Sequence, residues 1–394
     1  MKCNCKYCQN IDYDNSEYTV DLSTLKKIRP VGVSGLLRVK NDAEFLALSI
    51  DSCIDALDEL IIVYQDCEDD SPSIIEQKRL QYPDKIRTYL YRPIIISHNL
   101  TEEEMEYALA LPADSIHLLS NYYNYTLSKA SYRYAMKIDA DQIYFTDKLK
   151  FFCDAYRKEE KEKITLKEFW AAQTVHYFVD LINLFPRLLP DFSFSDELID
   201  LYKSYTLKMI GNKKYPISFS GINLYLESDK WVLPLGGAEK GMFLPFNGIH
   251  DHIVFEISAL SYYVPQPIYG GNLKYQNSLI EEFNLTKRMN LWKGFYKHIF
   301  LYGGFLWYHM AAVKEPGFTS HKEDYKSHTL PLFNDRVVFT TIETRLSPFV
   351  LRRWMRPWYY LFWNKEQEEL SQKYISEIEK ILCVRLNTDS NDEK

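Results

Sequence analysis

Two aspartates at the end of an apolar run are the residues best suited to chemistry in this sequence. Asp139 and Asp141 directly follow residues 134–138, whose composition predicts a buried strand. Residues two apart on an extended chain point to the same side, so both carboxylates would converge at the end of that strand. A hard divalent cation such as Mg²⁺ or Mn²⁺ relieves the repulsion between them and can then accept phosphate oxygens. The alternative is an ordinary solvated turn, because aspartate is common in turns.

An acidic turn follows a second apolar run, residues 60–64. This turn contains Asp66 and Asp69. A carboxylate at the end of a strand could accept hydrogen bonds from a uracil N–H group or from ribose hydroxyls. Ordinary turn chemistry is again the alternative, because aspartate and serine favour turns.

Basic residues end the first predicted strand, residues 35–39. Arg38 and Lys40 lie where a cation would meet a diphosphate. For Lys40 the alternative is a solvated position at the start of a helix. Asn41 is expected to begin that helix, with Glu44 three residues later in a capping-box arrangement.

The elements that would position these residues alternate along the chain. Short apolar runs and amphipathic segments follow one another from residue 33, which predicts an α/β fold. Strands are expected at 35–39, 60–64, 86–90, 134–138, 217–227 and 231–235, and helices at 41–57, 73–81 and 118–130. In an open α/β sheet ligands bind at the carboxyl ends of the strands, so the three polar segments would share one edge.

The chain is expected to have three parts. These are a polar N-terminal extension (1–30), an α/β domain (31–275) with a helical insertion at about 151–215, and a helical, aromatic-rich region (276–394).

Composition excludes some classes of protein. The 394 residues carry a net charge of −7, which argues against a nucleic-acid binder with a basic surface. The apolar run 299–313 is shorter than the roughly 20 residues that span a bilayer, and no apolar leader is visible at the N-terminus. Seven cysteines, an odd number, suit a reducing compartment. We therefore expect a cytoplasmic protein.

The order of four short motifs is similar to that of a known family. The motifs are Arg38-Val39-Lys40-Asn41-Asp42-Ala43, Tyr64-Gln65-Asp66-Cys67-x-Asp69-x-Ser71, Tyr122-Tyr123-Asn124-Tyr125 and Lys137-Ile138-Asp139-Ala140-Asp141. Over about residues 35–145 they resemble the nucleotide-sugar half of GT-A glycosyltransferases, and more narrowly the bacterial lipooligosaccharide β-1,4-N-acetylgalactosaminyltransferases. The sequence departs from that family at Asp42, where glutamate is usual, and at Asp70, where glycine is common.

The resemblance implies a fold and a reaction. The fold would be the Rossmann-like GT-A fold, a mostly parallel sheet with helices on both faces, followed by a helical C-terminal region. The reaction would be a metal-dependent, inverting transfer of a hexose or N-acetylhexosamine from a UDP-sugar. The acceptor would be a glycan or a lipid-linked oligosaccharide, in lipooligosaccharide or capsule biosynthesis.

The resemblance also implies roles for individual residues. Asp66 would contact the nucleoside, Asp139 the ribose or the metal, and Asp141 the metal. His309 resembles a further metal ligand, with a packing role as the alternative and His250 and His252 as competitors. The expected nucleotide site comprises Arg38, Lys40, Asn41, Asp66, Asp69, Asn124, Lys137 and Asp139.

Inverting transfer requires a base that removes the proton of the acceptor hydroxyl. Asp251, in a glycine-containing loop, resembles the family position, and Glu239 is the alternative. Both could instead be surface carboxylates, and a retaining enzyme would need neither.

Arginine and aromatic residues are dense in residues 351–363. Arg352, Arg353 and Arg356 alternate there with tryptophan and tyrosine, as in segments that lie on anionic lipid headgroups. We expect a peripheral contact with the inner face of the plasma membrane. Packing of these aromatics within the protein is the alternative.

Two other function classes remain open. A sugar-phosphate nucleotidyltransferase would use a similar metal–carboxylate crevice, but such enzymes usually have a glycine-rich loop after the first strand, and residues 38–43 contain no glycine. A non-catalytic glycan-binding or membrane-scaffold protein on a transferase fold is the other alternative. The presence of both Asp139 and Asp141 counts against it.

Overall fold

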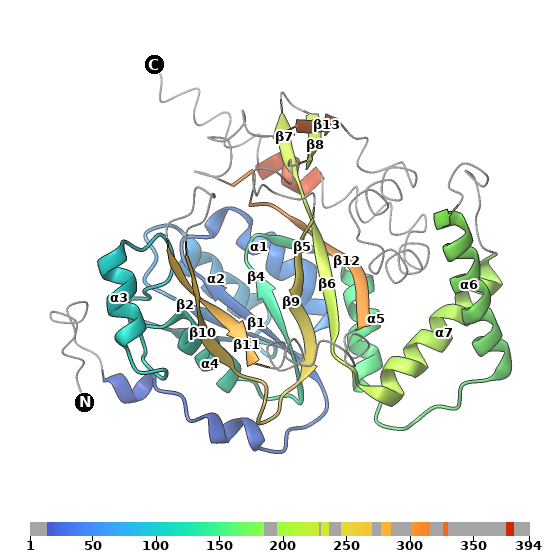
Figure 1. The fold of residues 1–394 in the computed structure, drawn as a ribbon, viewed down its shortest axis with the longest axis horizontal. Helices are drawn as coiled ribbons and strands as arrows, with labels where there is room; N and C mark the ends of the chain where they lie inside the picture. Colours follow the sequence, from blue (N-terminus) through green and yellow to red (C-terminus); the bar gives the residue numbers. More distant parts are fainter. Residues whose placement is uncertain are drawn as a thin grey trace.

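An eight-stranded mixed sheet organises the computed structural model (Figure 1), in the order β3-β2-β1-β4-β9-β6-β12-β5. The structure describes residues 14–184, 195–227, 230–235, 246–269, 277–284, 301–311, 313–314, 326–329 and 376–381. The sheet strands are β1 (Val33–Val39), β2 (Glu59–Tyr64), β3 (Ile86–Leu90), β4 (Tyr134–Asp139), β5 (Gln142–Tyr144), β6 (Ile217–Asn223), β9 (Phe246–Glu256) and β12 (Leu301–His309). Strands β1 to β4 pair in parallel, as predicted.

The apolar runs are continuous because both faces of these strands are covered. Along β2, Leu60 and Ile62 belong to one core cluster, whereas Ile61 and Val63 belong to the cluster on the opposite face. Helices α1 (Ala43–Cys53), α2 (Ser71–Gln81) and α5 (Thr146–Arg157) cover the first face. Helix α4 (Leu119–Ser128) and the hairpin of β10 (Tyr263–Ile268) and β11 (Ser278–Phe283) cover the second. The predicted α/β class is confirmed.

The remaining described elements flank this sheet. Helices α6 (Leu166–Leu184) and α7 (Asp196–Lys213) pack on each other beside α5, at the opposite end of the molecule from α3 (Glu102–Ala110) (Figure 1). Strands β7 (Tyr225–Glu227), β8 (Lys230–Leu235) and β13 (Lys326–Thr329) form a small separate sheet. Among the described residues, no helix is both long and apolar enough to cross a membrane.

The N-terminal segment is part of the packed structure from residue 14. Its short 3₁₀ helices, Asn15–Glu17 and Leu22–Lys26, bring the buried Tyr18 and Leu25 into the core cluster around α4. The prediction that residues 1–30 form a polar extension is therefore wrong for residues 14–30. A few apolar residues among many polar ones were enough to anchor this segment.

The predicted start of the first helix is also wrong. Helix α1 begins at Ala43, and its N-cap residue is Asp42. Asn41 precedes the helix with a left-handed backbone (φ 56°), a conformation that asparagine tolerates better than most residues. No capping box forms, because with Asp42 as the N-cap the third helical residue is Phe45 rather than Glu44.

The C-terminal region, residues 276–394, was expected to be helical, but most of its described residues lie in strands. They contribute strands β11, β12 and β13, and a short helical segment at 376–381. Strand β12 lies within the main sheet, parallel to β6 and antiparallel to β5. Periodicity cannot separate a buried strand from a buried helix in an uncharged apolar run, and aromatic side chains favour the strand.

The junction of β6 and β12 leaves no space for a side chain at Gly221. A Cβ atom there would lie 1.8 Å from Nε1 of the fully buried Trp307. We expect Gly221→Ala to lower the free energy of unfolding by about 2 kcal/mol or more, as overpacking does. Urea denaturation measures this. Gly211→Ala is the control, because the nearest atom would be 3.3 Å away, and an equal loss in both variants would contradict the prediction.

Candidate functional site

Arg38 and Asp139 are neighbours because of the register of β1 and β4. The parallel pairing sets these two residues side by side at the carboxyl ends of their strands. The guanidinium Nη2 lies 3.7 Å from Oδ1 of Asp139, and the Arg38 side chain is only 7% exposed. The sequence prediction that these residues share one edge of the sheet is thus confirmed by the strand pairing.

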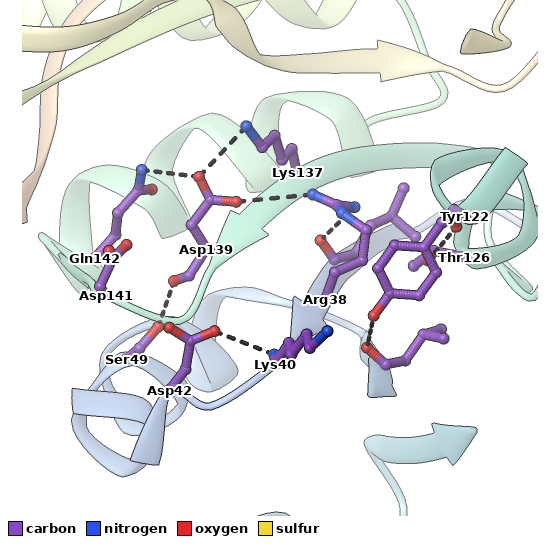
Figure 2. A network of polar contacts seen from close by, with 12 residues as sticks. Arg38, Lys40, Asp42, Ser49, Tyr122, Thr126, Lys137, Asp139, Asp141 and Gln142 are labelled. Carbon is purple, nitrogen blue, oxygen red and sulfur yellow. Dashed lines mark hydrogen bonds and ion pairs between the residues drawn. The ribbon is translucent and has the colours of Figure 1, made fainter. Parts of the chain in front are cut away.

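Several donors surround the carboxylate of Asp139 (Figure 2). Lys137 Nζ lies 3.4 Å from Oδ2, and Gln142 Nε2 donates to the same oxygen at 3.2 Å. The Arg38 guanidinium also stacks on the ring of Tyr123, 3.6 Å from its centroid. Arg38 and Lys137 supply two positive charges next to Asp139, and the negative charge of Glu281 also acts on Arg38.

Asp141 belongs to a second group of charges beside the first. His309 Nε2 lies 3.5 Å from its Oδ1, and Lys314 Nζ lies 3.9 Å from its Oδ2. Strand β12 brings these residues to the site, because His309 pairs with Gln142 of β5 and the Met310 N–H donates to the Asp141 carbonyl at 2.8 Å. Lys314 also forms an ion pair with Asp42.

The two carboxyl groups of this second group differ in acidity. Burial raises the pKa of Asp141, but His309 and Lys314 oppose it, and the net pKa lies below its ordinary value. Burial, and to a smaller extent the negative charge of Asp141, raises the pKa of Asp42. The opposing effect of Lys314 is not large enough to offset this, so the pKa of Asp42 lies above its ordinary value. Asp141 is therefore the more readily ionised of the two.

A divalent cation at this site would have two protein ligands among the described residues. Among the described residues, no three His, Cys, Asp or Glu side chains lie together as a metal site. Asp139, the third predicted ligand, is surrounded by Arg38, Lys137 and Gln142. Asp141 and His309 remain close enough to share one ion. A carboxylate oxygen and an imidazole nitrogen suit Mn²⁺, with other positions left for phosphate oxygens and water.

A cavity of about 970 Å³ opens at this edge of the sheet. Arg38, Lys40, Asp139 and Lys314 line it on the side of the strand ends, and residues 94–100 line it on another. This volume is at the upper end of the range typical of small-molecule sites. The cavity therefore offers space for a ligand next to these charged groups.

Two predicted nucleotide ligands instead hold the acidic turn in place. Asp69 accepts hydrogen bonds from the N–H groups of Ala43 and Ser71, at 2.9 and 3.0 Å. Asn41 accepts one from the N–H of Glu68 at 2.9 Å. Both residues thereby fix the start of α1 against the turn. Asp66 is exposed and does not line the cavity, so its role as a nucleoside ligand stays a prediction.

Asn124 fixes a strand rather than facing the cavity. Its amide donates to the Tyr263 carbonyl at 2.9 Å and accepts from the Tyr263 N–H at 2.8 Å. The side chain is buried, and these two bonds to β10 explain its place in the motif. The prediction that Asn124 binds the nucleotide is not supported by this geometry.

We expect Asn124→Ala to reduce stability without weakening nucleotide binding. The substitution removes both hydrogen bonds that the Asn124 side chain makes to the backbone of Tyr263, at a cost of about 2–4 kcal/mol. Chemical denaturation measures the loss, and calorimetric titration with UDP measures the affinity. A tenfold weaker affinity in the folded variant would restore Asn124 to the binding site.

The structure describes only one of the two predicted catalytic bases. Asp251 lies in strand β9, together with His250 and His252, rather than in a loop. Gly248 suggested a loop, but the segment pairs with β6 and β4 across the sheet. Glu239 and residues 351–363 lie outside the described residues.

Sequence reasoning missed Lys314 and the role of Asp42. Asp42 was noted only as a departure from a family motif, and Lys314 was not singled out at all. The one available signal was that Lys314 comes five residues after His309. Its pairing with Asp42 depends on β12 entering the sheet, which no local pattern encodes.

Comparisons with known proteins agree with the resemblance seen in the sequence. The model of the family described as beta-1,4-N-acetylgalactosaminyltransferase (CgtA) matches residues 14–167. This segment contains all four motifs, from Arg38 to Asp141. The resemblance is therefore confirmed for this part of the chain, which is similar to this glycosyltransferase family. No curated protein matches the chain.

Among the solved structures that are similar to this chain, three show the level of similarity. Two are glucosyl-3-phosphoglycerate synthase from Mycobacterium tuberculosis, one with Mn²⁺, UDP and glucosyl-3-phosphoglycerate and the other with Mn²⁺, UDP and phosphoglyceric acid. Both are 19% identical with a TM-score of 0.18, over 31% of this chain and 37% or 36% of theirs. The chain thus matches little more than a third of their length. A mycobacterial protein is 12% identical over 79% of this chain and 86% of its own, with a TM-score of 0.29.

Proposed function

We propose that this chain transfers a hexose or N-acetylhexosamine from a UDP-sugar to a hydroxyl group of a glycan. One observation supports this most: Arg38 and Asp139 lie side by side on the wall of the cavity, at the carboxyl ends of two parallel strands. Such strand ends are where open α/β sheets bind nucleotides. Both residues fall within the segment that matches the glycosyltransferase family.

Three of the charged residues around the cavity suit the leaving group of this reaction. Transfer of the sugar releases a nucleoside diphosphate, whose negative charge grows as the glycosidic bond breaks. Arg38, Lys40 and Lys314 line the cavity and can face that charge. Fixed cations that act where charge develops stabilise the transition state more than the ground state.

Asp141 and His309 are the residues that would hold a divalent cation. Mn²⁺, or Mg²⁺ in its place, supplies Lewis-acid stabilisation of the departing diphosphate. Arg38 and Lys137 keep the neighbouring Asp139 carboxylate in a fixed position. Asp139 is then available to accept hydrogen bonds from ribose hydroxyls of the donor.

An inverting mechanism, with Asp251 as the base, is part of the proposal. The antiparallel register pairs Met136 of β4 with Val254 of β9. Three residues further toward the site along these two strands come Asp139 and Asp251, so β9 carries Asp251 toward the same edge. Glu239 remains the alternative base.

The cellular setting that we propose is the cytoplasmic side of lipooligosaccharide or capsule assembly. The arginines and aromatics of residues 351–363 suit a peripheral contact with anionic lipid headgroups. Co-sedimentation with anionic liposomes tests this contact. Replacing Arg352, Arg353 and Arg356 together by serine should abolish binding, and unchanged binding would refute the contact.

Release of UDP from a panel of UDP-sugars, with and without Mn²⁺, tests the proposed reaction. We expect UDP to be released from at least one N-acetylhexosamine or hexose donor, and faster with Mn²⁺ and a glycan acceptor. Formation of UTP from a UDP-sugar and pyrophosphate would indicate a nucleotidyltransferase instead. No turnover and no binding of any donor would favour a non-catalytic protein.

A further inference from the structure

Lys314 lies between two carboxylates that a divalent cation would also attract. Its ammonium group pairs with Asp42 and lies 3.9 Å from Asp141 Oδ2, while His309 lies on the other oxygen of Asp141. The Lys314 side chain is 24% exposed and lines the cavity. A positive charge of the protein itself therefore already sits beside the Asp141–His309 pair.

The backbone of Lys314 is anchored, so only its side chain needs to move. The Met310 N–H donates to the Asp141 carbonyl at 2.8 Å, and the Lys314 N–H donates back to the Met310 carbonyl at 3.1 Å. The four-carbon stem of lysine is flexible, and its ammonium makes no fixed two-point contact of the kind that arginine makes. The ammonium can therefore exchange one anionic partner for another within the cavity.

We propose that Lys314 competes with the divalent cation for Asp141 until a nucleotide diphosphate draws the ammonium away. A lysine ammonium and a dication on the same carboxylate repel each other, so the ion binds weakly while Lys314 stays in place. A bound diphosphate offers Lys314 a second anion on the same cavity wall. Nucleotide and metal then bind cooperatively, beyond the contacts that they make with each other. This inference rests on the proposed function, because it takes the diphosphate and the ion from it.

Mn²⁺ affinity of the purified protein, measured by calorimetry with and without UDP, tests this inference. Without UDP, Lys314→Met is expected to bind Mn²⁺ about tenfold more tightly than the wild type, a coupling of ordinary size. In the same variant, UDP should increase the Mn²⁺ affinity by a smaller factor than in the wild type. Lys314→Gln, whose amide can still donate to Asp42, should behave like Lys314→Met. Agreement between the two variants would show that the change in affinity does not come from misfolding of one of them.

Two controls separate the specific effect from a change in net charge. Lys40→Met removes a positive charge from the same cavity wall, but we expect it to change the Mn²⁺ affinity less than twofold without UDP. Lys314→Arg keeps the charge and should resemble the wild type. Unchanged or weaker Mn²⁺ binding in both Lys314→Met and Lys314→Gln would overturn the inference. A different result would overturn the proposed function itself: no binding of UDP by the wild-type protein, either with or without Mn²⁺.

Discussion

Replacing Asp141 by asparagine is expected to reduce UDP release from the preferred UDP-sugar by about 10³-fold or more, as loss of Lewis-acid stabilisation would. Within the part of the chain that the structure describes, Asp141 is the carboxylate that lies beside both His309 and Lys314. Asparagine keeps the size of the side chain but removes the anionic oxygen that a dication needs. The fold should persist, because the substitution also removes repulsion between Asp141 and Asp139.

The same variant should fail to bind Mn²⁺ at concentrations that saturate the wild type. Because the pKa of Asp141 lies below its ordinary value, this group stays ionised from about pH 5 to 8. Wild-type activity should therefore not be lost through protonation of Asp141 in that range. Asp70→Asn, in the exposed part of the acidic turn, is the matched control and should change the rate less than twofold. Full activity of Asp141→Asn would contradict the assigned role.

Replacing Arg38 by methionine is expected to weaken UDP binding by about 100-fold, the loss of one or two charge-assisted hydrogen bonds. Arg38 is almost fully buried, stacks on Tyr123 and pairs with Asp139. Its guanidinium is thus held in one orientation at the cavity wall before any ligand arrives. Methionine fills similar space but leaves the region short of one positive charge.

Calorimetric titration of UDP measures this effect, and two further variants interpret it. Arg38→Lys keeps the charge but not the planar group stacked on Tyr123, so we expect an intermediate loss of about tenfold. Arg79→Met removes an exposed arginine of α2 that pairs with Glu76, and it should leave UDP affinity unchanged. Equal affinities for Arg38→Met and wild type would place the diphosphate elsewhere.

The parallel part of the sheet could be predicted from the sequence because its signals are local. The run that became β2 is apolar throughout residues 60–64, and that of β4 is apolar throughout residues 134–138 except at Lys137, since each face packs against a separate core cluster. The rule that ligands bind at the carboxyl ends of such strands then placed Arg38 and Asp139 at the same edge of the sheet. The match of residues 14–167 covers the same part of the chain.

The other half of the site depends on contacts between distant segments. His309 and Lys314 reach Asp141 because β12 joins β5 and β6, and the apolar run that forms β12 reads equally well as a helix. Asn124 and Asp69 were predicted to bind a ligand, but their hydrogen bonds are made to the backbone of neighbouring segments. Residue type alone does not separate a polar group that holds the fold from one that awaits a ligand.

Calorimetric titration of the wild-type protein with UDP, UMP and uridine in the presence of Mn²⁺ tests the central claim most directly. If the strand edge with Arg38, Asp139 and Asp141 binds a diphosphate together with a dication, UDP should bind at least tenfold more tightly than UMP. Uridine should bind more weakly still, and removal of Mn²⁺ should weaken UDP most. Equal affinities for UDP and uridine, or no dependence on Mn²⁺, would contradict this account of the site.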